Sequence, residues 1–113
     1  MRQPSPGTEP PSGAFRVVNE DAGPVLHLLG DVDEPLVQRM RAAGLNERDL
    51  VAVQVAAVGY IDSTGLSLLV RWAQSAAQDG RPAVLRSASP RFRRVLDLAG
   101  ISVLFVHEDD GRA

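Results

Sequence analysis

Hydrophobic positions along the chain follow two periods, one typical of strands and one typical of helices. Short apolar runs bounded by polar or glycine-rich stretches predict strands, and apolar residues spaced three and four apart predict helices. The predicted strands cover residues 15–20, 25–29, 50–56, 83–87 and 103–106. The predicted helices cover residues 36–43, 63–79 and 89–99, and a glycine follows each of them.

The order of these elements predicts the fold class. It runs strand, strand, helix, strand, helix, strand, helix, strand, and the turn at residues 21–24 makes the first two strands a hairpin. The later strands are joined through helices, which requires parallel neighbours. We therefore expect an α/β fold, with a mixed but mostly parallel β-sheet and helices packed against it.

The most informative stretch joins the buried strand at residues 50–56 to the helix that follows. Asp62, Ser63 and Thr64 stand where this helix should begin, and their side-chain oxygens are suited to accept its first free backbone N–H groups. Gly65 removes side-chain bulk from the first turn. A pair of hydroxyls is thus presented at the positive end of a helix dipole, where a phosphate on Ser63 would be tolerated.

The helix after this corner carries two apolar sets. The set expected to face the core is Leu66, Leu69, Val70, Ala73 and Ala77. Leu68 and Trp72 are spaced four apart and are expected to point away from that set. This pair has two interpretations: a contact for a partner protein, because Trp is enriched in interface hot spots, or residues half-buried under a neighbouring loop.

Composition narrows the kinds of partner. The 113 residues suffice for one domain, and 12 basic against 14 acidic residues argue against nucleic acid as the main partner. All the basic residues are Arg, which indicates a GC-rich bacterial genome. The absence of Cys excludes disulfides and thiolate metal sites, and no cofactor is predicted.

No apolar run has the length of a membrane span or the character of a signal peptide, so we expect a cytoplasmic protein.

Three segments together resemble the STAS domain of anti-sigma factor antagonists. They are the Asp-Ser-Thr-Gly-Leu motif at Asp62–Leu66, the acidic turn at Leu29–Asp33 and the run at Ser89–Ile101. The resemblance extends from about Phe15 to Val106 and implies the STAS fold. It divides the chain into a disordered tail at residues 1–13, a STAS domain at residues 14–107 and a short tail at residues 108–113.

The resemblance also implies a binding protein rather than an enzyme. In this family the serine after the motif's aspartate is the regulatory phosphoserine, here Ser63, and Thr64 is a possible secondary site. The implied partners are an anti-sigma factor with ATP-dependent serine kinase activity and a metal-dependent serine phosphatase. The unphosphorylated form would bind the anti-sigma factor and release a sigma factor. The residues that we assign to the partner surface are Asp31, Asp33, Asp62, Ser63, Thr64, Gly65, Leu68 and Trp72.

Several features qualify this assignment. Asp33 would equally well cap the next helix, because Pro35 suits a first helical turn. The segment between Gly30 and the central strand is shorter than in the family, and Gln54 stands where many relatives carry Asp. The family normally carries a C-terminal helix after the last strand, and here either this helix is absent or the chain is cut short; loss of a covering helix would leave apolar surface open, which would favour self-association.

Two other functions fit parts of the sequence. An enzyme with Ser63 as nucleophile lacks the Gly-x-Ser-x-Gly elbow, and its only possible histidine bases, His27 and His107, have no catalytic context. A STAS scaffold subunit of a signalling or transporter-associated complex, without phosphorylation, would fit the short first helix and the missing last one. The intact motif at residues 62–65 favours the phosphorylation switch.

Overall fold

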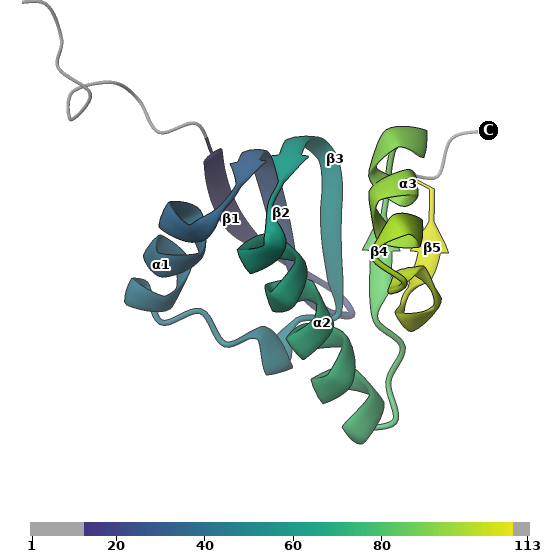
Figure 1. Cartoon of the computed structure of the whole chain (residues 1–113). Helices are drawn as coiled ribbons and strands as arrows, with labels where there is room; N and C mark the ends of the chain where they lie inside the picture. The colour runs from purple at the N-terminus through teal and green to yellow at the C-terminus, as the bar shows by residue number, and fades with distance from the viewer. Residues whose placement is uncertain (1–12, 110–113) are drawn as a thin grey trace, which may run out of the picture.

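The computed structural model describes residues 13–109 and has the predicted order of strands and long helices (Figure 1). The strands are β1 (Gly13–Glu20), β2 (Gly23–Val32), β3 (Ala52–Ile61), β4 (Val84–Arg86) and β5 (Val106–Glu108). The helices are α1 (Glu34–Ala42), α2 (Ser63–Gln78) and α3 (Pro90–Leu98), with short 3-10 turns η2 (Glu47–Asp49) and η3 (Ser102–Leu104). The predicted tails lie mostly outside the described residues. Two residues assigned to the tails lie in strands: Gly13 is a buried residue of β1, and Glu108 belongs to β5.

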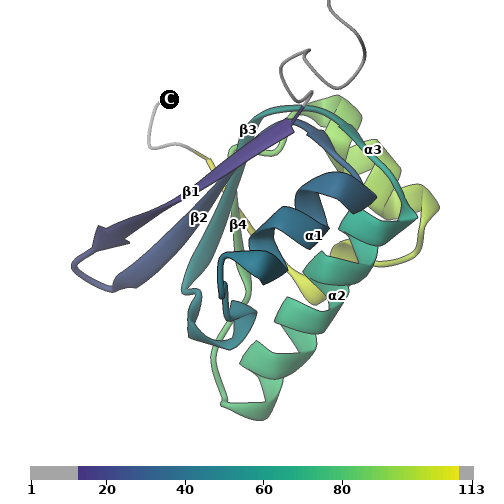
Figure 2. The same ribbon diagram turned by 90° about the vertical axis from the view of Figure 1, so that its left-hand side faces the viewer.

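The sheet confirms the predicted mixed topology. Its strands lie in the order β1-β2-β3-β4-β5; β1 and β2 are antiparallel, and all other neighbours are parallel. All three α-helices cover one face of this sheet, whereas the other face carries no helix within residues 13–109 (Figure 2). The parallel crossovers place the carboxyl ends of β2 and β3 at the same edge, where α1 and α2 begin.

The hydrophobic core lies between the helices and the covered face of the sheet. Alternate strand residues point into it, including Leu26 of β2, Val53 of β3 and Leu85 of β4, each no more than 1% exposed. The helices add apolar residues at helical spacing. Their largest fully buried side chains are Leu36, Val37, Met40, Leu69, Trp72 and Leu96.

The predicted orientation of α2 is wrong by a rotation about its axis. Leu68 and Trp72, expected to point away from the core, are 4% and 1% exposed. Of the set expected to face the core, Leu69 and Ala73 are buried as predicted, whereas Leu66 and Val70 are only half-buried and Ala77 is exposed. Two overlapping apolar stripes are present on this helix, and the helix buries the one that holds its only Trp. Because Leu68 and Trp72 lie inside the core, neither is available to contact a partner.

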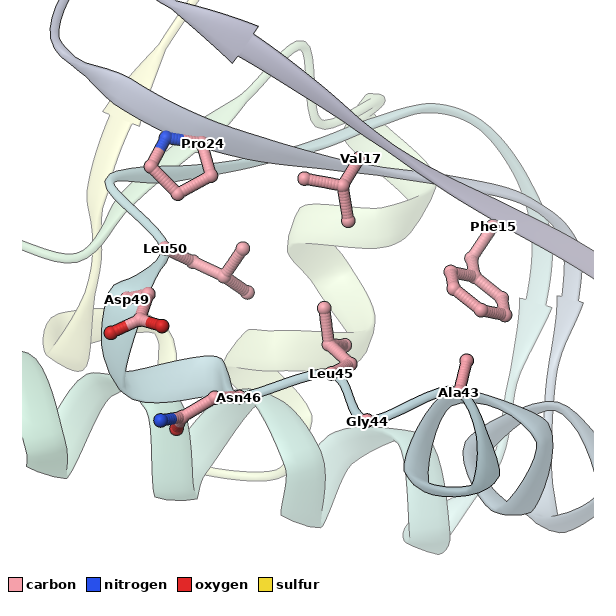
Figure 3. Close-up of a pocket in the computed structure, with 9 residues that line it drawn as sticks. All are labelled: Phe15, Val17, Pro24, Ala43, Gly44, Leu45, Asn46, Asp49 and Leu50. Atoms are coloured by element: carbon pink, nitrogen blue, oxygen red, sulfur yellow. The ribbon is translucent and has the colours of Figure 1, made fainter.

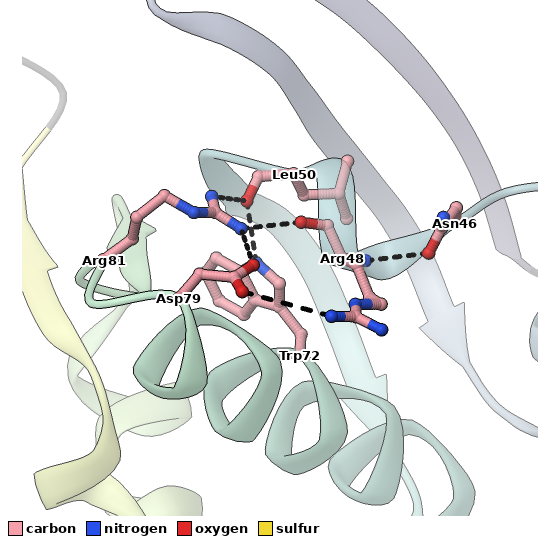
Figure 4. Close-up of polar contacts among 6 residues, drawn as sticks. All are labelled: Asn46, Arg48, Leu50, Trp72, Asp79 and Arg81. Atoms are coloured by element: carbon pink, nitrogen blue, oxygen red, sulfur yellow. Dashed lines mark hydrogen bonds and ion pairs between the residues drawn. The ribbon is translucent and has the colours of Figure 1, made fainter.

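A hydrogen-bond network fixes the carboxyl half of α2 to the segment before β3 (Figure 4). The Trp72 indole nitrogen donates to the carbonyl oxygen of Leu50 (3.1 Å), and Arg81 donates to the same oxygen (3.3 Å). Arg81 also donates to the carbonyl oxygen of Arg48 (2.6 Å) and pairs with Asp79. The Trp72 ring stacks on Phe105, with centroids 6.0 Å apart. This half of the helix is therefore held by both packing and polar contacts.

An ion-pair cluster crosses the open face of the sheet. Arg86 of β4 bonds Glu20 of β1 at 3.0 Å and Glu108 of β5 at 3.0 Å. The hydrogen bond with Glu20 raises the pKa of the Arg86 guanidinium above its ordinary value, although burial opposes this shift. Since β2 and β3 lie between β1 and β4, this contact requires the end of the β1–β2 hairpin to curve over the open face.

The carboxyl-terminal region differs from prediction. Residues 102–104 form η3, so the strand predicted to start at residue 103 starts only at Val106, as β5. Leu98, Val103 and Val106 are 79%, 91% and 51% exposed, so apolar surface is open in this part of the described chain. Self-association through it stays a prediction. Within the described range, no helix is both long enough and apolar enough to span a membrane.

Candidate functional site

The candidate site is the edge of the sheet where β2 and β3 end. Val32 and Ile61 are paired across these two strands, and the N–H of Asp62 donates to the carbonyl oxygen of Val32 (3.1 Å). The pairing brings the acidic turn after β2 beside the Asp62–Leu66 motif after β3. Asp31 near the end of β2, Asp33 in the turn after it and Asp62 after β3 therefore lie on neighbouring segments of this edge, as the resemblance to STAS domains implies.

Asp62 is the N-cap of α2. Its backbone is extended, and its side-chain Oδ1 accepts the N–H of Gly65 (3.0 Å), while its carbonyl oxygen accepts the N–H of Leu66 (2.9 Å). A carboxylate here also interacts favourably with the helix dipole. The predicted N-cap at this corner is thus confirmed, and Asp62 is the residue that forms it.

Gly65 is a packing requirement of the same turn. It is buried, and a Cβ built on it would lie 2.7 Å from both the Ile61 Cγ1 and the Val32 carbonyl oxygen. One of these neighbours is backbone, so a larger residue would push α2 away from the ends of β2 and β3. Gly65 lets the motif turn lie directly on the sheet, which fixes where Ser63 is presented.

Ser63 and Thr64 occupy the first two positions of α2 and differ in exposure. Ser63 is exposed, whereas Thr64 is half-buried. The hydrogen bonds of this turn pass through Asp62, and none of them uses the Ser63 hydroxyl. Ser63 is therefore the more accessible of the two hydroxyls at the positive end of the helix.

The two aspartates at the carboxyl end of β2 have different structural roles. Asp33 is the N-cap of α1: its Oδ1 accepts the N–H of Leu36 (3.2 Å), and Pro35 lies in the first turn, as the capping interpretation predicts. Asp31 lies within β2, opposite Tyr60, and is half-buried. A contact of either carboxylate with a partner stays a prediction, but the carboxylate of Asp33 already serves the fold.

A shallow apolar hollow begins at Ser63. Its volume is about 440 Å³, and it lies between the outer face of α2 and the chain that follows α3. Its lining residues are Ser63, Leu66, Ser67, Val70, Arg71, Ala99 and Ile101. Apart from Ser63, none of them was assigned to the partner surface from the sequence, because Leu66 and Val70 were expected in the core. If the helix face that carries Leu68 and Trp72 had been predicted as the buried one, Leu66 and Val70 would have been predicted on the exposed face, beside this hollow.

The surroundings of Ser63 offer little for nucleophilic chemistry. Of the two histidines, His107 bonds the backbone oxygen of Ser102 (3.1 Å) and the Ser102 hydroxyl (3.2 Å), in and near η3. His27 lies within β2, opposite Gln54. Across residues 13–109, no three side chains of metal-ligand type gather in one place. What the corner does present is a hydroxyl beside an apolar surface.

A second hollow lies away from this corner, beneath β1 (Figure 3). Its volume is about 290 Å³, and Phe15 and Val17 of β1 face Leu45 and Leu50 across it. The connection between α1 and β3 forms its other wall. No residue of Leu29–Asp33, of the Asp62–Leu66 motif or of the rest of α2 lines it, so this hollow is separate from the candidate site.

Comparison with solved structures shows what this fold is similar to. An anti-sigma factor antagonist from Mycobacterium paratuberculosis superposes with a TM-score of 0.68 at 20% identity, with 86% of each chain covered. The anti-sigma factor antagonist SpoIIAA in its unphosphorylated form gives a TM-score of 0.62 at 19% identity, covering 83% of this chain and 87% of that one. SpoIIAA of Bacillus in its phosphorylated form gives 0.60 at 19%, covering 83% and 90%. At about 20% identity, these structural similarities show that the chains share a fold, and they do not by themselves show a shared function.

Sequence comparison identifies the family. A search of curated proteins with this sequence gives no significant match. A scan against family models matches residues 15–106 to the family described as Mlab, STAS domain. That range runs from the third residue of β1 to the first residue of β5 and contains all three α-helices and the whole Asp62–Leu66 motif. The chain belongs to the STAS domain family.

Proposed function

We propose that this protein is an anti-sigma factor antagonist that binds its partner at the amino end of α2 and is switched off by phosphorylation of Ser63. The observation that carries the proposal is the placement of Ser63. It is exposed at the first position of α2 and lies on the border of an apolar hollow, while Asp62 and Gly65 hold the turn. A modification there alters the surface without removing a contact on which the fold depends.

The physical basis of the switch is that a phosphate on Ser63 costs little free energy in the free domain and much more in the complex. Phosphorylation adds roughly −1.5 to −2 charges. In the free domain the phosphate faces water at the positive end of a helix, so its cost is small. In a complex that covers the hollow, the same charge would be removed from water next to Leu66 and would approach the carboxylate of Asp62. Desolvation and repulsion then oppose binding while the domain stays folded.

The partner proposed for this site is an anti-sigma factor with serine kinase activity. It would transfer phosphate from ATP to Ser63, and a serine phosphatase would restore the unmodified form. The exposure of Ser63 supports it as the accepting residue, and the half-burial of Thr64 makes that hydroxyl the secondary one. Binding of the unmodified form would release a sigma factor from the anti-sigma factor.

Capture of partners from a lysate of the native host tests this proposal. The baits are wild type, Ser63→Ala and Ser63→Asp, with Gln74→Glu as a control that adds a charge elsewhere on the exposed surface of α2. Captured proteins are identified by mass spectrometry. We expect a kinase-like protein on wild type, Ser63→Ala and Gln74→Glu, and its loss from Ser63→Asp. Equal capture on Ser63→Asp contradicts the switch.

A second candidate function is a scaffold subunit without phosphorylation, in a signalling or transporter-associated complex. The observation that favours it is that the matching family model is described by Mlab rather than by an anti-sigma factor antagonist. The same capture experiment separates the two functions. A partner that is not kinase-like, held equally by all four baits, supports the scaffold.

A further inference from the structure

Strand β3 is longer than the neighbour on one of its sides. It pairs with β2 along nearly its whole length, from Ala52 to Ile61, but β4 pairs only with Ala52–Gln54. Residues 55–61 therefore have no strand beside them on the β4 side within the described part of the chain. A strand edge of this kind presents unpaired N–H and C=O groups that are able to accept another strand.

The first part of this edge is closed by the protein itself. The Gln54 side chain accepts the N–H of Ala56 (3.0 Å), directly after the last pairing with β4. Register shifts in the pairing with β2 then give β3 extra residues before Ala57 and before Tyr60. Bulges also limit edge pairing. The open edge is thereby reduced to a short stretch, Ala57–Ile61.

Gly59 lies in the middle of this stretch and is the extra residue of the second register shift, between Val58 and Tyr60. Its φ is not positive, and a Cβ built on it would meet no atom within 4 Å. By contrast, Gly65 would clash with Val32 and Ile61 if it carried a Cβ. A glycine within a strand is typical of a bulge and also of a place where another backbone approaches closely, and the open space beside Gly59 leaves room for such an approach. Tyr60, beside it, is a 56% exposed aromatic residue.

A pocket lies between this edge and α3. Its volume is about 180 Å³, smaller than the roughly 300–1,000 Å³ typical of small-molecule sites, so it is suited to a protein side chain. The lining residues are Val58, Gly59, Tyr60, Ile61, Ser89, Arg91, Phe92 and Val95. Arg91 is exposed and has no ion pair within residues 13–109, whereas Arg93 on the same helix pairs with Asp109.

We propose that Ala57–Ile61 accepts an extended segment of a partner protein by strand addition. One apolar side chain of that segment enters the pocket against Phe92 and Val95, and an acidic side chain pairs with Arg91. Main-chain hydrogen bonds to the edge supply affinity, and the pocket supplies specificity. This surface goes beyond the proposed switch, because neither Ser63 nor Thr64 belongs to the edge or to the pocket.

Two designed peptides test the proposal with the full chain. In one, Ile and Glu take turns at every second residue, so that both lie on the face toward the pocket, with Thr at the positions between; in its twin, Lys replaces each Glu. Binding is followed by backbone amide NMR shifts and by hydrogen exchange. We expect the Glu peptide to shift and protect amides of residues 57–61 and to shift those of 89–95, with an affinity about two- to fivefold higher than that of the Lys peptide, since exposed charge pairs contribute little.

Arg91→Glu is expected to reverse the preference between the peptides, with Arg94→Glu as the matched control. Arg94 is exposed on α3 but does not line the pocket, so its substitution should leave the preference unchanged. Retained amide shifts show that each variant is folded. Three outcomes would overturn the proposal: no change at residues 57–61 with either peptide, an unchanged preference in Arg91→Glu, or occupation of this edge by a second copy of the chain, seen as a dimer in ultracentrifugation.

Discussion

The two ends of helix α2 differ in how they are held and in what they expose. At the carboxyl half, Trp72 packs on Phe105 and donates to Leu50, and Arg81 just beyond the helix closes the same contact. At the amino end, the polar contacts hold only the turn, and Ser63 remains exposed beside an apolar hollow. One end anchors the helix in the core, and the other end presents a surface.

This difference shows how a small domain can combine a stable fold with a modifiable surface. Because the helix is fixed at a site distant from Ser63, the proposed switch requires that a charge added at residue 63 change what the surface binds rather than how the helix packs. The same contrast predicts a gradient of mutational effects. Substitutions at the anchoring half should cost most stability, those within the motif turn less, and a change at Ser63 itself almost none.

The largest effect is expected for Trp72→Ala. Removing this buried ring should lower the free energy of unfolding by about 3–5 kcal/mol, measured by urea denaturation. Trp72→Phe is the matched variant; it keeps an aromatic ring against Phe105 and loses the hydrogen bond to Leu50, so it should cost clearly less. A loss below about 1 kcal/mol for Trp72→Ala, the average cost of any substitution, would show that this half of α2 is not the anchor.

An intermediate effect is expected for Gly65→Ala. The added Cβ would overpack the contact with Val32 and Ile61, which typically costs about 1–3 kcal/mol. Gly59→Ala provides the comparison, because its Cβ enters open space, and its cost should stay within about 0.5 kcal/mol. Both are measured by urea denaturation. Equal costs for the two variants would remove the argument that Gly65 sets the position of the motif turn.

A smaller effect is expected for Asp62→Ala. Loss of the cap on the Gly65 N–H should cost about 1 kcal/mol, whereas Asp62→Asn keeps an accepting oxygen and should cost little. Thermal denaturation at one pH compares the three proteins. Asp33→Ala is a useful parallel, since it removes the equivalent cap from α1. If Asp62→Asn is as unstable as Asp62→Ala, the aspartate acts through its charge rather than as a cap.

Much of the fold could be predicted from the sequence, because the turns and helix caps that short segments encode agree with the topology of the whole sheet. Two strands joined by a short turn gave the antiparallel hairpin, and helices between later strands gave the parallel pairs. Pro35 after Asp33 marked the start of α1, and Asp62 before Gly65 marked the start of α2. Caps and turns depend on a few neighbouring residues, so sequence identifies them well.

The face that α2 buries was not accessible in the same way. Apolar residues occupy nearly every position from Leu66 to Ala73, so helical periodicity alone fits more than one stripe. The choice depends on contacts from distant segments: Phe105 and the carbonyl of Leu50 fix Trp72 inside. The hollow beside Ser63, lined by Leu66 and Ile101, is a consequence of that choice and was missed with it.

The limits of β3 and β5 depended on long-range pairing as well. The sequence predicted that the central strand ends at Ala56, but pairing with the end of β2 extends it to Ile61. At the other edge, η3 takes the residues expected in the last strand, and β5 starts where pairing with Val84 begins. Strand ends of this kind are set by the partner strand rather than by local propensity.

The most direct test of the central claim uses the chain with phosphoserine incorporated at position 63. Its urea denaturation and its retention of the partner captured by the unmodified chain are measured side by side with wild type. The account predicts an unfolding free energy within about 0.5 kcal/mol of wild type, together with loss of the partner. Retention of the partner by the phosphorylated chain would contradict the claim, and so would a loss of binding that is accompanied by unfolding.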